Sequence, residues 1–101
     1  MKFDEKVYHV ISRIPKGKIS TYCDVACAIG TKAYRAVGQA LKRNPDDPRV
    51  PCHRVISSSG KLGGYSGKNG IKGKIKLLKK EGVEIIDGRI DLKKYFYRLR
   101  K

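Results

Sequence analysis

The residues best suited to chemistry lie near the middle of the chain, where Cys52 directly precedes His53 and Arg54. A cysteine reacts as its thiolate, and nearby positive charge favours that form over the thiol. A neighbouring histidine is a suitable acceptor for the thiol proton. Adjacent side chains usually point in different directions, so the same residues also fit a small buried cysteine beside a loop histidine. The local pattern makes Cys52 a candidate nucleophile and leaves both interpretations open.

The other two cysteines, Cys23 and Cys27, lie one helical turn apart. This spacing could place two metal ligands together, but no suitable histidine or second cysteine pair lies nearby, so we expect no metal. Three cysteines without a disulfide-like framework fit a reducing compartment. Residues 1–15 hold no apolar core of signal-peptide length, and nowhere do about 18 apolar residues run together. The sequence therefore predicts a cytoplasmic protein.

The charge of the chain predicts a polyanionic partner. Lysine and arginine number 24 against 9 acidic residues, which gives a net charge of +15 spread along all 101 residues. Nucleic acid fits best, because each neutralised phosphate releases counterions. A membrane surface fits less well, because the chain has no tryptophan and only two phenylalanines to insert. Solubility alone is the remaining alternative, although charge of one sign repels itself in the folded state.

A chain of this length can bury one core, and its first third predicts three helices. Apolar residues recur at helical spacing over Phe3–Ile14, and Pro15 closes the run. Thr21 followed by Asp24 resembles a capping box for a second helix, Tyr22–Ile29, which stops at Gly30. The third helix has two opposite faces. One is an apolar stripe of Ala33, Ala36, Val37, Ala40 and Leu41, and the other is a basic face of Arg35, Gln39 and Lys42 around Gly38. Two helices joined by a short turn are typical of a helix-turn-helix.

The rest of the chain predicts small β elements around one more helix. Two short strands about a turn are predicted at Val55–Ile56 and Lys61–Tyr65. A hairpin closed by an Asp-Gly turn is predicted from Val83–Ile86 and Arg89–Leu92. The helix between them begins near Ile71 and ends at Glu81-Gly82, with an outer face of Lys72, Lys74, Lys76, Lys79 and Lys80. We expect a mainly α fold with small β, a winged helix-turn-helix DNA-binding domain over residues 1–92. Residues 93–101 form a basic aromatic tail that we expect to pack loosely.

Several motifs in order resemble one family. The string Pro51-Cys52-His53-Arg54-Val55, with Asn44 before it and Gly64-Tyr65-Ser66-Gly67 after it, resembles the active-site segment of O6-alkylguanine-DNA alkyltransferases, the methylated-DNA–protein-cysteine methyltransferases. Ser20-Thr21-Tyr22 and Arg35-Ala36-Val37-Gly38 are similar to the DNA-binding helices of the same family. The resemblance runs from about Phe3 to Gly82.

The resemblance implies a single-turnover alkyl transfer. Cys52 is then the nucleophile that attacks the carbon bonded to guanine O6 and keeps it as a thioether, so that the protein is consumed. His53, bridged to Cys52 through a water and held by Glu81, accepts the thiol proton. Glu81 also fits a surface carboxylate at the end of a helix. No cofactor and no metal are needed, because sulfur itself receives the alkyl group.

The resemblance also implies roles in binding double-stranded DNA that contains O6-alkylguanine. The damaged base is stacked out of reach, so the nucleotide must be extruded into a pocket. Arg35 fills the gap in the stack, and Tyr22 crowds the target phosphate and donates a hydrogen bond to the base. The other implied residues are Gly38, Gln39 and Lys42 on the DNA, Asn44 bracing the loop, and Val55, Tyr65 and Ser66 around the guanine. Taken without the resemblance, Tyr22 fits a core aromatic and Arg35 a simple phosphate contact.

The ending of the chain departs from this pattern. Residues Asp87–Tyr95 resemble the related alkyltransferase-like proteins, which bind and flip the lesion but usually carry tryptophan in place of the reactive cysteine. Many alkyltransferases also have another domain before the one matched here. A non-catalytic lesion sensor is therefore the alternative function, and an ordinary winged-helix regulator is a third. In each case we expect a monomer that binds DNA and no membrane.

Overall fold

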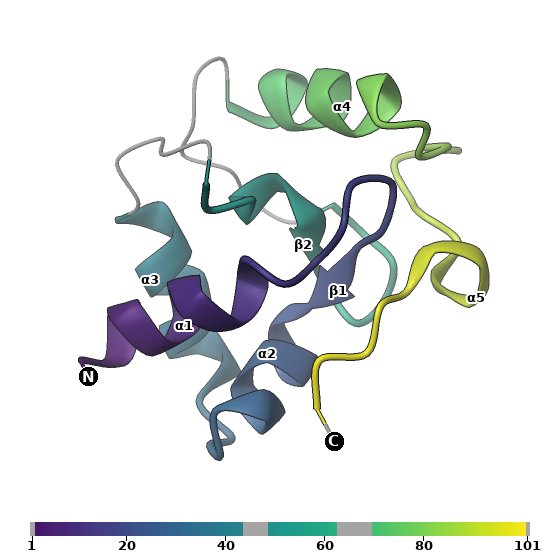
Figure 1. Ribbon diagram of the computed structural model, residues 1–101. Coiled ribbons are helices and arrows are strands. Elements are labelled where there is room, and N and C mark those ends of the chain that lie inside the picture. The colour runs from purple at the N-terminus through teal and green to yellow at the C-terminus, as the bar shows by residue number, and fades with distance from the viewer. Residues whose placement is uncertain (1, 44–48, 63–69, 101) are drawn as a thin grey trace.

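The computed structural model describes residues 2–43, 49–62 and 70–100. Helices α1, α2 and α3 pack against one another on one side of a two-stranded sheet, and α4 lies on the other side (Figure 1). The elements are α1 (Phe3–Ile11), β1 (Ser20–Thr21), α2 (Tyr22–Ala28), α3 (Tyr34–Lys42), the 3-10 turn η1 (Cys52–Arg54), β2 (Val55–Ile56), α4 (Gly70–Lys80) and α5 (Leu92–Tyr95). The fold is a small, mainly helical domain with a small sheet, as expected.

Helix α1 is shorter than its apolar pattern predicts. It ends at Ile11 because Pro15 disfavours helical geometry in the residue before it, and the chain tightens into i→i−3 bonds. Ile14, beyond the helix, is nevertheless buried in the core with Val7 and Ile11. The apolar periodicity thus predicted the buried residues correctly and the helix end wrongly.

Helices α2 and α3 form the predicted pair, joined by residues 29–33. The Thr21 side chain accepts a hydrogen bond from the Asp24 N–H at 3.1 Å and so caps α2. The carboxylate of Asp24 does not complete the capping box, because it binds the far end of the chain instead. Gly30 has a φ of +82°, which a glycine adopts without strain, and this geometry turns the chain after α2.

The predicted turn between Ser57 and Lys61 is present, because the Ser57 N–H donates to the Lys61 carbonyl at 3.0 Å, but the predicted pairing of Val55–Ile56 with the second strand is wrong. Strand β2 pairs in parallel with β1, with Ser20 opposite Val55. Val55 and Ile56 are fully buried, and strands buried on both faces are typical of parallel pairing. Lys61 forms its bridge with Arg89 instead, and residues 63–65 lie outside the described residues.

A second core lies between the sheet, α4 and the following segment. Its buried members are Ile19, Ile56, Leu62, Leu78, Val83, Ile90 and Tyr95. The predicted Asp-Gly turn is present, since Ile86 and Arg89 exchange two backbone hydrogen bonds of 2.9 and 3.0 Å. Asp87 and Gly88 both have positive φ, as the mirror-image turns of tight hairpins require. The pairing does not extend into long strands.

The C-terminal tail is packed, contrary to the prediction that it is loose. Tyr95 and Leu99 are buried, and Leu99 belongs to the first core. The tail runs beside β1, where the Ile19 N–H donates to the Tyr95 carbonyl and the Tyr97 N–H donates to the Ile19 carbonyl. The Leu99 N–H donates to the buried Asp24 carboxylate at 2.6 Å. Tyr95 and Leu99 are thus the buried residues of the tail, whereas its remaining described side chains, including Phe96 and Tyr97, are exposed.

Candidate active site at Cys52

Cys52 lies at the start of the turn η1, directly before strand β2. The Arg54 N–H donates to the Pro51 carbonyl at 2.9 Å, which closes the turn. The cysteine is 7% exposed and packs in the first core, so its sulfur is nearly enclosed by protein. By contrast, Cys23 and Cys27 are exposed on α2. Reagents in solution therefore reach these two thiols more readily than Cys52.

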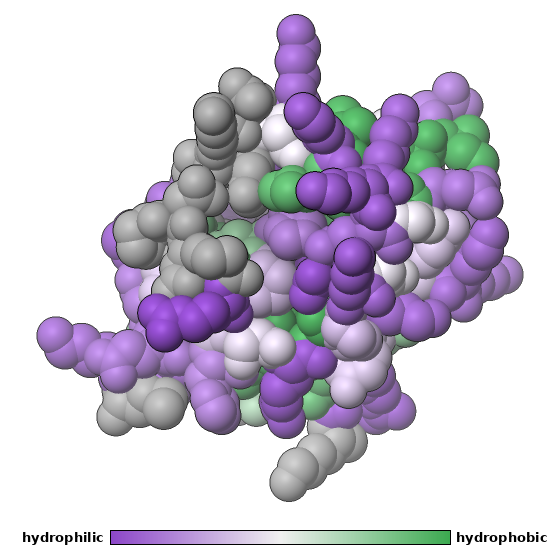
Figure 2. Space-filling view, turned by 45° about the horizontal axis from the view of Figure 1, so that its top comes forward, coloured by the Kyte–Doolittle hydropathy of each residue, from purple (hydrophilic) through white to green (hydrophobic). Residues whose placement is uncertain are grey.

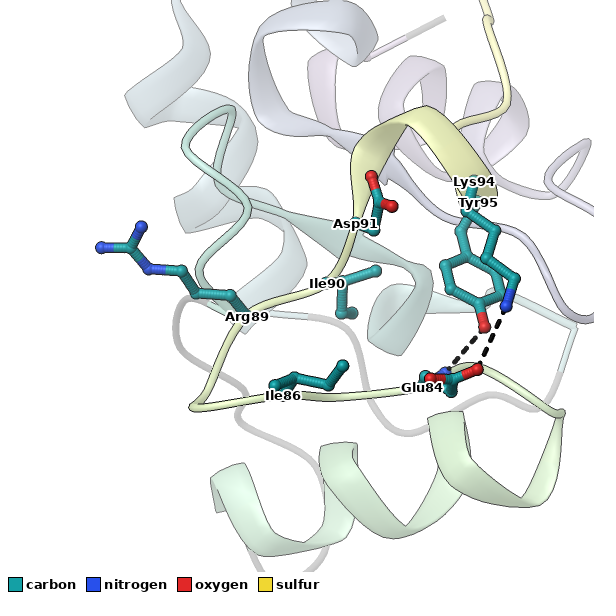
Figure 3. Close-up of a pocket in the computed structure, with 7 residues that line it drawn as sticks. All are labelled: Glu84, Ile86, Arg89, Ile90, Asp91, Lys94 and Tyr95. Carbon is teal, nitrogen blue, oxygen red and sulfur yellow. Dashed lines mark hydrogen bonds and ion pairs between the residues drawn. The ribbon is translucent and has the colours of Figure 1, made fainter.

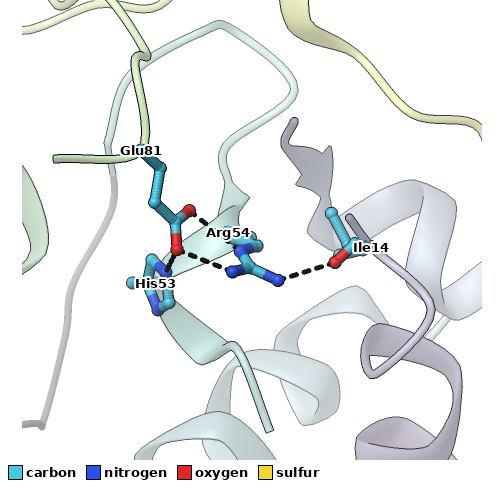
Figure 4. Close-up of polar contacts among 4 residues, drawn as sticks. All are labelled: Ile14, His53, Arg54 and Glu81. Atoms are coloured by element: carbon cyan, nitrogen blue, oxygen red, sulfur yellow. Dashed lines mark hydrogen bonds and ion pairs between the residues drawn. The ribbon is translucent and has the colours of Figure 1, made fainter. Parts of the chain in front are cut away.

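His53 and Arg54 both bind Glu81, at the C-terminal end of α4 (Figure 4). His53 Nε2 lies 3.0 Å from Glu81 Oε2, as expected. Arg54 donates to both carboxylate oxygens, at 2.9 and 2.6 Å, and to the Ile14 carbonyl at 2.8 Å. Sequence reasoning missed this role of Arg54, although an arginine has the forked donors that a carboxylate accepts in pairs. Glu81 is thus held by two residues of η1, and the same contacts hold in place the turn that carries Cys52.

The protonation of this cluster follows from its surroundings. Burial lowers the pKa of His53, and Glu81 only partly opposes the effect. Burial acts to raise the pKa of Glu81, but the hydrogen bonds from Arg54 and His53 outweigh it and hold that pKa below its usual value. An ionised carboxylate can only accept, so we assign the proton of neutral His53 to Nε2. Nδ1 is then a proton acceptor, as a general base needs.

Lys74 corrects the predicted outer face of α4. Instead of facing solvent, it is fully buried, and its Nζ donates to the carbonyl oxygens of Val55, at 2.7 Å, and Leu62. Lys74 precedes the buried Leu78 by one turn and shares its face, whereas Ile71, predicted to be buried, is 42% exposed. The remaining members of the predicted outer face are exposed: Lys72, Lys76, Lys79 and Lys80.

Burial lowers the pKa of Lys74 from its usual 10.5 to about 8, and negative charge on Cys52 opposes this. The ammonium form still predominates at neutral pH. Lys74 is therefore a buried cation within electrostatic range of the cysteine, where it favours the thiolate. Apart from the one-turn spacing to Leu78, no sequence pattern indicated this arrangement.

Two tyrosines share the surroundings of Cys52. Tyr22, the first residue of α2, is partly buried, and burial followed by negative charge on Cys52 raises its pKa. Tyr8 is affected in the same way, chiefly by burial, and its hydroxyl donates to the Ala40 carbonyl at 2.6 Å. Both phenols thus remain protonated donors at neutral pH. Tyr22 was predicted as a site residue, whereas Tyr8 was missed.

The basic face of α3 is present as predicted. Arg35, Gln39 and Lys42 are exposed, while Val37 on the opposite side is buried. Hydrophilic side chains also cover most of the molecular face in Figure 2. A Cβ built on Gly38 meets nothing within 4 Å, so this glycine is not needed for packing inside the protein.

The predicted wall of the guanine pocket is described only in part. Val55 is buried, its N–H donates to the Cys52 carbonyl, and its own carbonyl accepts from Lys74. A carbonyl oxygen can accept a second hydrogen bond, so the expected contact of Val55 with a base stays a prediction. Asn44, Tyr65 and Ser66 lie outside the described residues.

A separate pocket of about 350 Å³ lies between the Asp-Gly turn and α5 (Figure 3). Its lining residues are Glu84, Ile86, Arg89, Ile90, Asp91, Lys94 and Tyr95. None of these carries a thiol or an imidazole, so the pocket does not share the chemistry of Cys52. Among residues 2–43, 49–62 and 70–100, no cluster of three or more His, Cys, Asp or Glu residues could hold a metal. None of the helices in these ranges has the length and apolar character to cross a bilayer.

Comparison with known proteins agrees with this geometry. Residues 2–83 match the family described as 6-O-methylguanine DNA methyltransferase, DNA binding domain. The bifunctional methyltransferase/endonuclease of Picrophilus torridus is 50% identical over 90 residues, which are 88% of this chain and 30% of that protein. The chain therefore belongs to the family of the DNA-binding domain of 6-O-methylguanine DNA methyltransferases, as the motifs predicted.

Two solved structures resemble the chain closely. Atl1 of S. pombe, in complex with damaged DNA containing O6-carboxymethylguanine, superposes with a TM-score of 0.85 at 36% identity, over 97% of this chain and 99% of that one. OGT of Mycobacterium tuberculosis, in complex with DNA, has a TM-score of 0.75 at 43% identity, over 81% of this chain and 49% of that one. The chain spans 30% to 52% of the length of the first curated relatives that it matches.

Proposed function

We propose that this chain repairs O6-alkylguanine in DNA by irreversible transfer of the alkyl group to Cys52. The observation that carries the proposal is the arrangement around one turn: Cys52 nearly enclosed, and His53 held at 3.0 Å by an ionised Glu81. This arrangement supplies a nucleophile, a base with its acceptor nitrogen unoccupied by a proton, and a group that orients the base. Lys74 adds a buried positive charge.

DNA binding prepares the substrate. In this proposal α2 and α3 act as the helix-turn-helix of a winged DNA-binding domain, and α3 presents Arg35, Gln39 and Lys42 to double-stranded DNA. The protein acts as a monomer on DNA that contains the lesion. The near-complete burial of Cys52 means that its sulfur can meet only a group brought into the protein, so the nucleotide must leave the stack. Arg35 then takes the vacated place in the duplex.

The transfer step balances without a cofactor. His53 takes the thiol proton, through a water, and the thiolate attacks the alkyl carbon. The new S–C bond forms as the C–O6 bond breaks, and the electron pair of that bond goes to the guanine. Tyr22, kept protonated by burial, donates a hydrogen bond to the guanine. The proton that His53 took from the thiol returns to the guanine through solvent, so the base leaves neutral. The thioether is stable, so each molecule reacts once.

A lesion sensor is the second candidate, because one observation favours it. The segment after residue 83 lies beyond the family match, yet the superposition on Atl1 covers 97% of this chain. The sequence of Asp87–Tyr95 resembles the alkyltransferase-like proteins as well. In this alternative the protein flips and holds the damaged base but leaves the alkyl group on it.

Mass spectrometry separates the two candidates. We expect incubation with an O6-methylguanine duplex to add one methyl group to the peptide that contains Cys52, stoichiometrically, and to leave Cys23 and Cys27 unmodified. The Cys52→Ser variant should bind the duplex without reacting, and Cys27→Ser should react like the unaltered chain. Tight lesion binding with an unmodified Cys52 would instead establish the sensor.

A further inference from the structure

Helix α3 begins with an aromatic side chain that lies outside the two core clusters of the described residues. Tyr34 is the first residue of the helix, directly before Arg35, and is 47% exposed. It belongs to neither of the two core clusters that the described residues form. Tyrosine also favours a helix less than alanine does. Stability of the fold therefore does not explain a large aromatic residue at this position.

The helical geometry places Tyr34 at the edge of the face that we assign to DNA. Residues four apart lie on one line along a helix, so Gly38 follows Tyr34 on the same side. A Cβ at Gly38 would meet only open space, so among the described residues no neighbouring segment packs on Gly38. Helical side chains lean toward the N-terminus, so the ring lies at the same end of α3 as Arg35. Tyr34 and Arg35 thus lie at the same end of the helix, about 100° apart around its axis.

Extrusion of a nucleotide creates a surface that such a ring fits. When one base leaves the duplex, its two neighbours lose a stacking contact and its former partner loses its base pair. Aromatic side chains stack on exposed bases with about 1–3 kcal/mol per base, whatever the base is. Proteins that enter the minor groove also insert apolar wedges at disrupted steps. A tyrosine beside the arginine that fills the gap is well placed to cover one of these bases.

We propose that Tyr34 stacks on a base left without its neighbour when the damaged guanine leaves the duplex. The inference rests on the lesion binding of the proposed function, but not on the transfer to Cys52. The phenol ring supplies the contact, and its hydroxyl is not needed. Tyr34 thereby makes the protein prefer DNA that has an extruded nucleotide over intact DNA.

The test compares Tyr34→Ala and Tyr34→Phe with a matched control, Tyr97→Ala, which removes a tyrosine that is 38% exposed in the tail. Affinities are measured for an O6-methylguanine duplex, an abasic-site duplex and an intact duplex, with Cys52→Ser in every variant to prevent reaction. We expect Tyr34→Ala to lower the preference for both disrupted duplexes at least about fivefold, the loss of one stacked base. Tyr34→Phe and Tyr97→Ala should keep the preference within about twofold. Thermal unfolding confirms that each variant folds.

Three results would overturn the inference: an unchanged preference in Tyr34→Ala, an equal loss on all three duplexes, or a loss in Tyr34→Phe as large as in Tyr34→Ala. The last would assign the effect to the hydroxyl. A 2-aminopurine placed beside the abasic site gives a second readout. Its fluorescence should be quenched by the protein with Tyr34 and by Tyr34→Phe, and it should not be quenched by Tyr34→Ala. The abasic duplex contains no alkyl group, so it tests stacking alone. Failure of methyl transfer in the unaltered chain would therefore refute the proposed reaction and leave the stacking result intact.

Discussion

Gly38→Ala should make the protein more stable and a poorer binder of DNA. Gly38 lies inside α3 with helical φ, and the added methyl group would meet no atom within 4 Å. Alanine is favoured over glycine in a helix by about 1 kcal/mol. For a domain of about 100 residues this gain raises Tm by roughly 4–8 °C. Inside the free protein, nothing opposes that gain.

The cost of Gly38→Ala arises only when DNA is present. In the proposed complex α3 lies against the duplex, and a methyl group forced into a close contact costs about 1–3 kcal/mol. Chemical denaturation should therefore show a higher free energy of unfolding, and fluorescence anisotropy with a lesion duplex should show at least about a fivefold weaker affinity. The matched control is Gly30→Ala, where φ is +82°, so the same substitution should destabilise. A less stable Gly38→Ala, or one that binds DNA normally, would refute the reasoning.

Three further expectations concern the contacts of the site and the core. Glu81→Gln should destabilise the fold by about 3 kcal/mol, because Arg54 loses its buried ionic partner, and should slow methyl transfer at least tenfold; denaturation and single-turnover kinetics measure the two effects. Lys74 has a pKa of about 8 in the fold and 10.5 when exposed, so burial of its charge costs about 3 kcal/mol below pH 8. Between pH 8 and 10.5 the unfolded chain binds more protons than the folded one, so the free energy of unfolding should rise over this range. The rise should be absent in Lys74→Met. Leu99→Ala should cost about 2–4 kcal/mol in denaturant melts, against less than about 1 kcal/mol for the exposed Leu77→Ala.

Local pattern predicted the local structure. The ends of α2 were predicted to within one residue, because the cap at Thr21 and the glycine at position 30 act over one turn. The parallel pairing of β2 with β1 was not predicted. Residues 20 and 55 are far apart in the chain, and neither two-residue strand contains a sequence pattern that indicates which segment it pairs with. The short Asp-Gly turn, in contrast, was found because its signal is contained in two residues.

The candidate site divides in the same way. The contact of His53 with Glu81 was predicted from the family resemblance, and the structure contains it. The roles of Arg54 and Lys74 were missed because they depend on packing. Arg54 binds Glu81, which is distant in the sequence, and Lys74 is buried at a position of α4 that was predicted to face solvent. A lysine is rarely buried, so its type alone argues for exposure.

The contact between the tail and Asp24 can form only late in synthesis, after the tail has been added to the chain. The amide of Leu99 donates to the carboxylate of Asp24, in the first turn of α2, and the Leu99 side chain packs in the core with residues of α1, α2 and α3. A ribosome makes the chain from the N-terminus, so helices α2 and α3 are complete before Leu99, which packs in their core, has been added. The contacts that Leu99 makes with them can form only after residue 99 has been added. A chain broken off before residue 99 would keep Cys52, His53 and Glu81 but lose the contacts that fasten the tail to α2 and to the first core.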